Sequence, residues 1–349
     1  MSSEYKIALV GASSLLAKEL KECLTESPLA ASSFVLLDLE EAHGQLDQVG
    51  DEVTVVQVVG ENSFEGMDFT FFAGSEELTR KYWRHALRAG SSVLDLTGAL
   101  EGEPGVLVRA PWLQDGENSS VGLPDLLTKA VVPANAGALA LALMMDRLQE
   151  VAEIRFAAAT VLQPASEYGK EALDELHQQT VSLLSFQNMP RAVFDTQAAY
   201  NTLASFGESA TANLARSDER IRRHYALLAG DRLPNLRLQV IHAPVFHGQT
   251  FSICIELAEA VPLSTIEDAL GGDHLDLVLE ETDSPSNIAA AGQNDVLVWL
   301  KPEPPVDRLS GETSRFWLWA ASDNLRLAAQ NAVECALDLR RLRPHGQVQ

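Results

Sequence analysis

The stretch from Val131 to Leu148 reads Val-Val-Pro-Ala-Asn-Ala-Gly followed by Ala-Leu-Ala-Leu-Ala-Leu-Met-Met-Asp-Arg-Leu. An apolar run of the strand type ends at a proline and a polar Asn-Ala-Gly step, and strong helix formers follow for about three turns. The pattern predicts a strand that turns directly into a helix. Free N–H groups in a first helical turn stabilise an anion or a thiolate placed there. Ala136 therefore stands where a reactive side chain would be best placed.

The composition sets the class of protein. A chain of 349 residues with 46% apolar residues has room for two domains, each with its own core. The formal net charge of -23 repels phosphate backbones and anionic lipid, so we expect neither a nucleic-acid partner nor a membrane partner. The apolar runs are too short for a signal peptide or a bilayer span, and the three cysteines follow no metal or disulfide spacing. These features predict a cytoplasmic protein without a metal site.

The N-terminal segment has the order of a nucleotide-binding unit. An apolar strand from Lys6 to Val10 runs into Gly11-Ala-Ser-Ser-Leu-Leu-Ala17, and a helix follows from Lys18 to Leu24. In such βαβ units, backbone N–H groups of the turn hold a pyrophosphate. Ser14 and Ala17 replace the usual second and third glycines, which narrows the room for the pyrophosphate. A βα turn that binds nothing is the alternative interpretation.

Asp38 closes the second predicted strand, which begins at Phe34. An acidic side chain at this place accepts a hydrogen bond from a ribose hydroxyl and repels a 2′-phosphate. If a dinucleotide binds, the sequence therefore favours NAD over NADP.

The order of elements predicts an α/β fold class. Strands alternate with turns and a helix up to residue 96, which is typical of a Rossmann-like, doubly wound parallel sheet. After residue 150, longer strands separated by helices predict an α+β domain with a mixed, largely antiparallel sheet. The expected strands are 53–58, 68–73, 92–96, 152–163, 236–246, 251–257 and 296–300, and the expected helices are 76–89, 167–184, 218–228 and 322–342.

A pair of histidines and a cluster of arginines suggest two further kinds of site. His242 and His247 flank a short apolar run, but an odd separation in a strand puts them on opposite faces, so they do not form a metal pair. Arg220, Arg222 and Arg223 could hold a substrate carboxylate. A solvated helix face is the alternative for these arginines.

Several segments resemble the aspartate-semialdehyde dehydrogenase family. The stretch Ser322-Asp-Asn-Leu-Arg-Leu-Ala-Ala-Gln-Asn-Ala-Val333 is similar to its D-N-L-x-K-G-A-A-x-N-A-V helix. Ala199-Tyr-Asn-Thr-Leu203 resembles its A-F-N-x-x-P segment, and His242-Ala-Pro-Val-Phe-His-Gly248 resembles its R-V-P-V-x-x-G-H turn. Ala73-Gly-Ser75 and the opening Gly11-Ala-Ser-Ser match its A-G-G and G-A-T-G turns.

The resemblance implies a homodimer built from two domains. A Rossmann-like dinucleotide-binding domain would comprise residues 1–130 and 322–349, and a catalytic-like dimerisation domain would comprise 131–321. Family members are oxidoreductases of amino-acid biosynthesis that make β-aspartyl semialdehyde from aspartyl phosphate with NADPH, through a thioester on a cysteine and with a histidine as acid and base. The implied cofactor-binding residues are Gly11, Ala12, Ser13, Ser14, Leu15, Asp38, Ala73, Gly74 and Asn324.

The resemblance implies a position in this chain for each catalytic residue of the family, and none of these positions holds the family's residue. The cysteine position holds Ala136, and the catalytic histidine position holds Gln249. The family's strand glutamine falls on Leu162, because using Gln163 needs a one-residue shift that turns it to the other face. The phosphate-binding arginine falls on Glu101, which reverses the charge. All four positions are expected in one pocket.

Our hypothesis from the sequence is a degenerate homologue that has lost phosphorylating semialdehyde dehydrogenase activity. It would keep NAD(P) binding, a small-molecule ligand, or a dimeric regulatory or scaffold role. An active NAD(P)-dependent semialdehyde dehydrogenase with displaced catalytic groups is the alternative. A protein that keeps only the dimer surface and binds neither NAD nor NADP is a third.

Overall fold

The computed structural model describes residues 5–114, 124–279, 284–307 and 309–342. The chain forms two compact units, one of residues 1–134 with 328–349 and one of residues 135–327. The predicted divisions were 130/131 and 321/322. The compact units divide at 134/135 and 327/328, after the last strand of the first sheet has run on to Pro133 and after the first turn of the C-terminal helix. The predicted boundaries of the functional domains stay a prediction.

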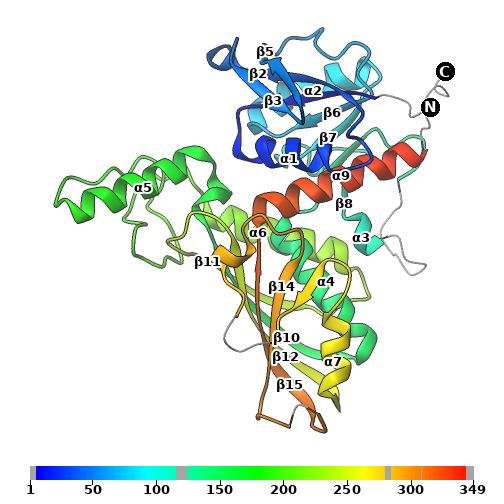
Figure 1. The fold of residues 1–349 in the computed structure, drawn as a ribbon, viewed down its shortest axis with the longest axis vertical. Coiled ribbons are helices and arrows are strands. Elements are labelled where there is room, and N and C mark those ends of the chain that lie inside the picture. Colours follow the sequence, from blue (N-terminus) through cyan, green and yellow to red (C-terminus); the bar gives the residue numbers. More distant parts are fainter. Residues whose placement is uncertain (1–4, 115–123, 280–283, 308, 343–349) are drawn as a thin grey trace. The chain divides into compact units, whose positions relative to one another are not determined.

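The first unit is a doubly wound, parallel sheet (Figure 1). Its seven strands lie in the order β5-β2-β1-β6-β7-β9-β8, and every neighbouring pair is parallel. The elements are β1 (Lys6–Val10), α1 (Leu15–Thr25), β2 (Ser33–Asp38), β3 (Leu46–Val49), β4 (Glu52–Val55), β5 (Gln57–Val58), β6 (Phe69–Phe72), α2 (Glu76–Arg88), β7 (Ser92–Asp95), β8 (Val106–Arg109), α3 (Pro111–Gln114), β9 (Ala130–Pro133) and α9 (Asn324–Leu342).

Alternate residues of β1 enter two different cores. Ile7 and Leu9 pack on the face covered by α1 and α9, and Ala8 and Val10 pack on the face covered by α2. Successive strand side chains point to opposite faces, so an apolar run without polar gaps is what a strand covered on both sides requires. The predicted Rossmann-like fold class is confirmed.

The region 53–58 differs from the single strand that the sequence predicts. Here β4 pairs antiparallel with β3 in a separate hairpin, and the two-residue β5 joins the edge of the main sheet beside β2. Val53 and Val55 are exposed in this hairpin. An alternating valine pattern indicates a strand, but it does not say which sheet the strand joins.

The second unit is a six-stranded mixed sheet in the order β11-β10-β12-β15-β14-β13. The three central pairs are antiparallel, and the two outer pairs are parallel. Its elements are α4 (Ala136–Val151), β10 (Ile154–Gln163), α5 (Lys170–Leu184), α6 (Leu214–Ala229), β11 (Leu236–His242), β12 (Gln249–Pro262), α7 (Leu263–Leu270), β13 (Leu275–Leu277), α8 (Asn287–Ala290), β14 (Val296–Pro302) and β15 (Glu312–Ser322).

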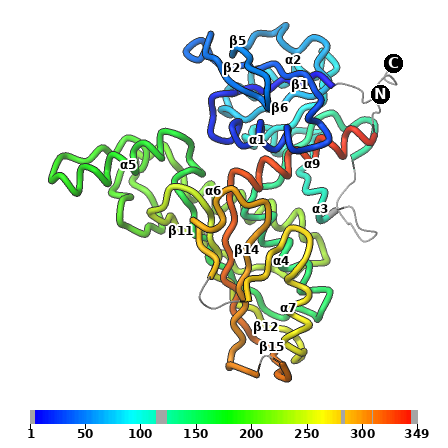
Figure 2. Tube along the Cα trace, in the orientation of Figure 1, coloured from blue at the N-terminus to red at the C-terminus, as the bar shows by residue number. Residues whose placement is uncertain are grey.

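The helix α4 is the centre of this unit. It packs against α6, α7 and β10, and almost every residue from Ala136 to Leu148 is buried. A helix that is apolar on all sides is typical of such a buried position. In contrast, α5 projects away from the sheet of its own unit, as the chain path in Figure 2 shows.

The opposite face of this sheet carries three of the chain's five tryptophans. Trp299 and Trp319 are register partners in β14 and β15, and Trp317 is 41% exposed on the same face. Phe156 of β10, 44% exposed, also leaves this side of the unit apolar. No helix among the described residues is long and apolar enough to cross a membrane.

Candidate active site

The predicted strand-to-helix turn is formed by β9 and α4. Asn135 caps the helix, because its Oδ1 accepts hydrogen bonds from the backbone N–H of Gly137 at 2.9 Å and of Ala138 at 3.4 Å. Ala136 is the first helical residue and is buried. The structure therefore places a methyl group at the start of the helix, where the positive end of the helix dipole lies.

Gln249 lies against this first helical turn. A Cβ added to Gly137 would meet its Oε1 at 3.0 Å and its Nε2 at 3.1 Å. The Gln249 side chain is 1% exposed, and neither amide atom has a hydrogen-bond partner among the described residues. Two of the positions predicted for the site, Ala136 and Gln249, therefore lie close together within the second unit.

The register of β10 shows which faces Leu162 and Gln163 occupy, and the assignment of the family's glutamine position to Leu162 stays a prediction. Gln163, not Leu162, lies on the buried face of β10, and Leu162 pairs with Thr250 beside Gln249. Side chains of β10 alternate between its two faces from Ala157 onward, which turns Gln163 inward. Its Nε2 donates to Ser217 at 2.6 Å, and its Oε1 accepts from the Tyr168 hydroxyl at 2.9 Å.

A carboxylate that the sequence analysis missed lies beside Asn135. The Nδ2 of Asn135 donates to Glu167 Oε1 at 3.4 Å, and the Nδ2 of Asn324 donates to Glu167 Oε2 at 3.2 Å. Burial raises the pKa of Glu167, while the charge of Arg220 and these two amides act in the opposite direction. Asn324 was predicted as a cofactor-binding residue, and within its own unit it binds Glu167 and Ser166.

His224 holds the backbone of the same turn. Its Nδ1 accepts the N–H of Asn135 at 2.9 Å, and the side chain is fully buried. Burial lowers the pKa of His224 to about 3, and the charges of Arg220 and Arg223 act in the same direction. The ring is therefore neutral at pH 7 and holds the turn without acting as an acid. The contact joins residues 89 positions apart, so no local pattern in the sequence could reveal it.

His242, at the end of β11, lies in an aromatic cluster. The rings of Phe194, Phe206 and Tyr168 have their centroids 5.1, 5.3 and 6.3 Å from its own, and the side chain is fully buried. Burial lowers the pKa of His242 to about 4. His247 is exposed on the following turn. Among the described residues, no group of three or more His, Cys, Asp and Glu side chains is placed to hold a metal ion.

Most of the predicted cofactor-binding residues meet in the first unit. The turn after β1 touches the turn after β6, since a Cβ on Gly11 would lie 2.2 Å from the Cα of Gly74. The Ser14 hydroxyl donates to the carbonyl of Ala73 at 2.7 Å and accepts from Ala17 N–H at 3.0 Å. Only a glycine fits at Gly11, where φ is +81°.

Asp38 is bonded to the same turn. Its Oδ2 accepts from the Ser13 backbone N–H at 2.8 Å and from the Ser13 hydroxyl at 2.6 Å, and its Oδ1 accepts from Leu39 N–H at 2.8 Å. The N–H groups of Gly11 and Ala12 donate to Leu37. A pyrophosphate must therefore find its donors in the first turn of α1, which begins at Leu15.

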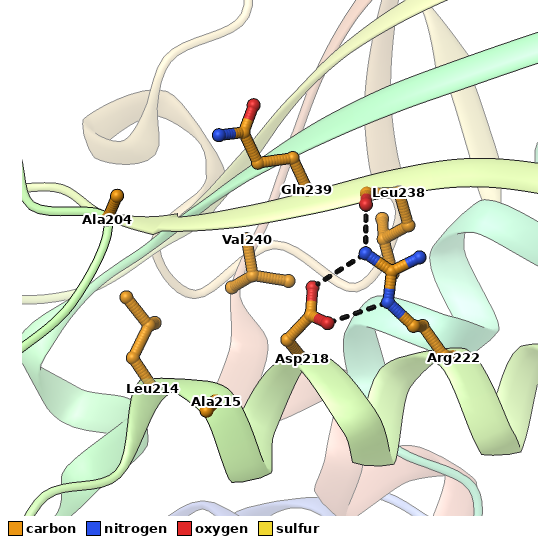
Figure 3. Close-up of a pocket in the computed structure, with 8 residues that line it drawn as sticks. All are labelled: Ala204, Leu214, Ala215, Asp218, Arg222, Leu238, Gln239 and Val240. Atoms are coloured by element: carbon orange, nitrogen blue, oxygen red, sulfur yellow. Dashed lines mark hydrogen bonds and ion pairs between the residues drawn. The ribbon is translucent and has the colours of Figure 1, made fainter.

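Two further predicted groups belong to other elements. Glu101 is in the turn after β7, in the first unit. Arg222 forms an ion pair with Asp218, from its Nε to Oδ2 at 2.6 Å, and donates to the carbonyl of Leu238 on the edge strand β11 (Figure 3). This arginine lines a small pocket between α6 and β11, whose residues do not include any of those around Ala136. Its contacts are those of a structural side chain covering a strand edge.

Comparison with known proteins decides the family. Residues 6–132 match the description "Semialdehyde dehydrogenase, NAD binding domain", and residues 145–327 match "Semialdehyde dehydrogenase, dimerisation domain". The chain belongs to the semialdehyde dehydrogenase family. The resemblance found in the sequence motifs is thereby confirmed.

Individual members of the semialdehyde dehydrogenase family match over nearly the whole chain. A USG-1 protein homolog from Pseudomonas aeruginosa is 30% identical, over 95% of this chain and 97% of its own length. An aspartate-semialdehyde dehydrogenase from Rickettsia bellii is 24% identical, over 97% and 98%. The solved structure of a probable aspartate-semialdehyde dehydrogenase from Pseudomonas aeruginosa superimposes with a TM-score of 0.81 at 28% identity, over 98% of this chain and 99% of that one.

The buried histidines make stability depend on pH. The pKa values of His224 and His242 are lowered in the folded state, so the unfolded chain binds more protons below pH 6.5 and stability falls as pH decreases toward 4. The free energy of unfolding, measured by urea unfolding, should fall between pH 7 and pH 5 in both proteins. We expect this fall to be about 2 kcal/mol smaller in His242→Leu than in the wild type. His247→Leu removes an exposed histidine as the control. An equal loss in wild type and H242L would contradict this account.

Proposed function

We propose that this chain is a family member that performs no thioester chemistry and acts as a dimeric, nicotinamide dinucleotide-binding protein. The observation that carries the proposal is Ala136 at the first position of α4, with the Gln249 amide against the same turn. An alanine has no atom that can attack an acyl group, and a glutamine amide does not exchange protons near neutral pH.

The chain's own cysteines do not replace the missing nucleophile. Cys254 points to the outer face of the sheet in β12, opposite to Gln249, and burial together with the charges of Glu303 and Glu256 raises its pKa. Cys335 is fully buried in α9, and burial raises its pKa as well. The third cysteine, Cys23, is buried in α1 of the first unit. Thiols with raised pKa values are poor nucleophiles. An active enzyme with displaced catalytic groups therefore finds no support among the described residues.

Turnover tests the proposal directly. We expect purified wild-type protein to show no phosphate-dependent oxidation of aspartate semialdehyde with NAD or NADP. We expect Ala136→Cys to gain a thiol whose pKa lies below about 8.5, because the first turn of α4 stabilises a thiolate. The pH dependence of iodoacetamide labelling measures that pKa, with the wild type and its three native cysteines as the control. A wild-type turnover number of about 1 s⁻¹ or more would refute the proposal.

The cofactor part of the proposal rests on Asp38. Its carboxylate uses three of about four acceptor positions on Ser13 and Leu39, which leaves one for a ribose hydroxyl. A 2′-phosphate at the same place would meet a buried negative charge. The residues present thus fit NAD better than NADP. The family description of residues 6–132 supports binding of a nicotinamide dinucleotide in general.

We expect NAD to bind at least about tenfold more tightly than NADP, a difference of about 1.4 kcal/mol, in isothermal titration calorimetry. Asp38→Asn removes the charge and should narrow this ratio. Glu41→Gln removes an exposed acidic charge of the following turn and should leave the ratio nearly unchanged. Tighter binding of NADP by the wild type would be the contrary result.

The dimer part rests on the uncovered sheet face of the second unit. Trp317, Trp319 and Phe156 lie on this face, and the residues that form it belong to the matched dimerisation domain. A large aromatic patch on a soluble protein marks an interaction surface. A second copy of the chain is the occupant that the family description supports.

Trp317→Glu should weaken the dimer because it places a charge in the centre of the buried face. We expect the wild type to elute as a dimer in size-exclusion chromatography with light scattering, and W317E to shift toward monomer at micromolar concentration. Phe186→Glu, at a side chain that is 98% exposed on the segment after α5, is the matched control. A wild-type monomer, or a W317E dimer as stable as the wild type, argues against this surface.

A further inference from the structure

Glu167 occupies the polar end of the candidate active site. Each oxygen of its carboxylate accepts a hydrogen bond from a side-chain amide, Oε1 from Asn135 and Oε2 from Asn324. These two asparagines stand at the starts of two long helices, since Asn135 caps α4 and Asn324 is the first residue of α9. A carboxylate held by donors at two helix starts has the surroundings of a bound anion.

The charge distribution supports this description. The helices α4 and α9 have 16 and 19 residues, so each starts with the positive end of a helix dipole. At α9 this end is capped by the buried carboxylate of Asp323, whose Oδ1 accepts from the N–H groups of Leu325 and Arg326 at 3.1 Å. Arg220 of α6 adds a positive charge that acts on Glu167. The two amide donors and the arginine all belong to the second unit, and α9 continues into the first unit from residue 328.

A second buried polar group lies at the start of α4. The amide of Gln249 is buried against the first turn of α4, and neither of its atoms has a partner among the described residues. The same point beside Gly137 lies 3.0 Å from Gln249 Oε1 and 3.3 Å from Asn135 Oδ1. An amide left unsatisfied in a protein interior costs about 1–3 kcal/mol, so its retention next to Asn135 indicates that the start of α4 accepts a polar group in addition to the Glu167 side chain.

We infer that the starts of α4 and α9 form a binding site for small carboxylates, which the chain fills with its own Glu167 side chain. In the wild type, Glu167 competes from within the chain and excludes free carboxylates. When Glu167 is shortened to alanine, the site accepts one from solution. The fragment that this substitution removes has the heavy atoms of acetate, so acetate is the matched probe.

The affinity for acetate is expected to be modest. A tethered carboxylate loses no translational freedom when it enters the site, whereas a free one does. Burial also opposes the charged form, as the raised pKa of Glu167 indicates. We therefore expect a dissociation constant of about 1–10 mM for the vacated site.

Thermal unfolding at constant ionic strength tests this inference. Sodium acetate replaces sodium chloride stepwise, and acetamide serves as the uncharged isostere. We expect Glu167→Ala to lower Tm. Acetate should raise the Tm of this variant again, saturably, by about 2–4 °C, whereas chloride and acetamide should not. Wild-type protein should show no saturable response, because its own carboxylate fills the site.

Three variants control the experiment. Glu167→Gln keeps the side-chain volume, so it should not respond to acetate. Glu171→Ala removes an exposed carboxylate nearby and should also not respond. Glu167→Ser is a second shortened variant for the case that E167A does not fold. The inference is overturned if acetate stabilises the folded shortened variant no more than chloride does, or if it stabilises the wild type equally.

The inference does not depend on the loss of turnover or on the cofactor. Enzyme turnover by the wild type would refute the proposed function, but it would not change the expected acetate response of E167A. An absent acetate response would refute the internal carboxylate and leave the turnover and dinucleotide titrations unaffected.

Discussion

The candidate active site depends on Asn135, whose four polar groups are all hydrogen bonded. Its Oδ1 caps α4, its backbone carbonyl accepts from Leu139 N–H, its backbone N–H donates to His224, and its Nδ2 donates to Glu167. These bonds fix the direction of α4 and bring α6 and the segment after β10 to the same turn. None of them involves the side chain at position 136, so the scaffold of the site does not depend on which residue stands there.

The sequence predicts what depends on neighbouring residues. The turns at Gly11 and Asn135 follow from apolar runs, turn residues and helix formers within a few positions, and the structure shows both. The 11-residue strand β15 is not predicted, because its outward residues Arg315, Trp317 and Trp319 interrupt an apolar run with charge and bulk. Only pairing with β12 and β14 shows that it crosses the middle of the sheet.

The site residues follow the same division. Ala136 and Gln249 can be found from motifs, because each stands in a short pattern that resembles the family's. Glu167 and His224 cannot, because they reach Asn135 across 32 and 89 positions of sequence. Whether Leu162 or Gln163 faces the buried side of the sheet depends on one residue of strand register, which is set by the pairing of β10 with β11 and β12. Motif comparison alone contains no such constraint.

Each unit has one of its own carboxylates at a turn or a helix start, which are places where proteins commonly bind an anion from solution. In the first unit, Asp38 accepts the N–H and hydroxyl of Ser13 in the turn that precedes α1. In the second, Glu167 accepts two amides at helix starts. A donor that already has an acceptor within the chain gains little from an outside anion, because binding then exchanges one hydrogen bond for another. The same carboxylates that stabilise the fold of each unit therefore occupy donors that an outside anion would otherwise use.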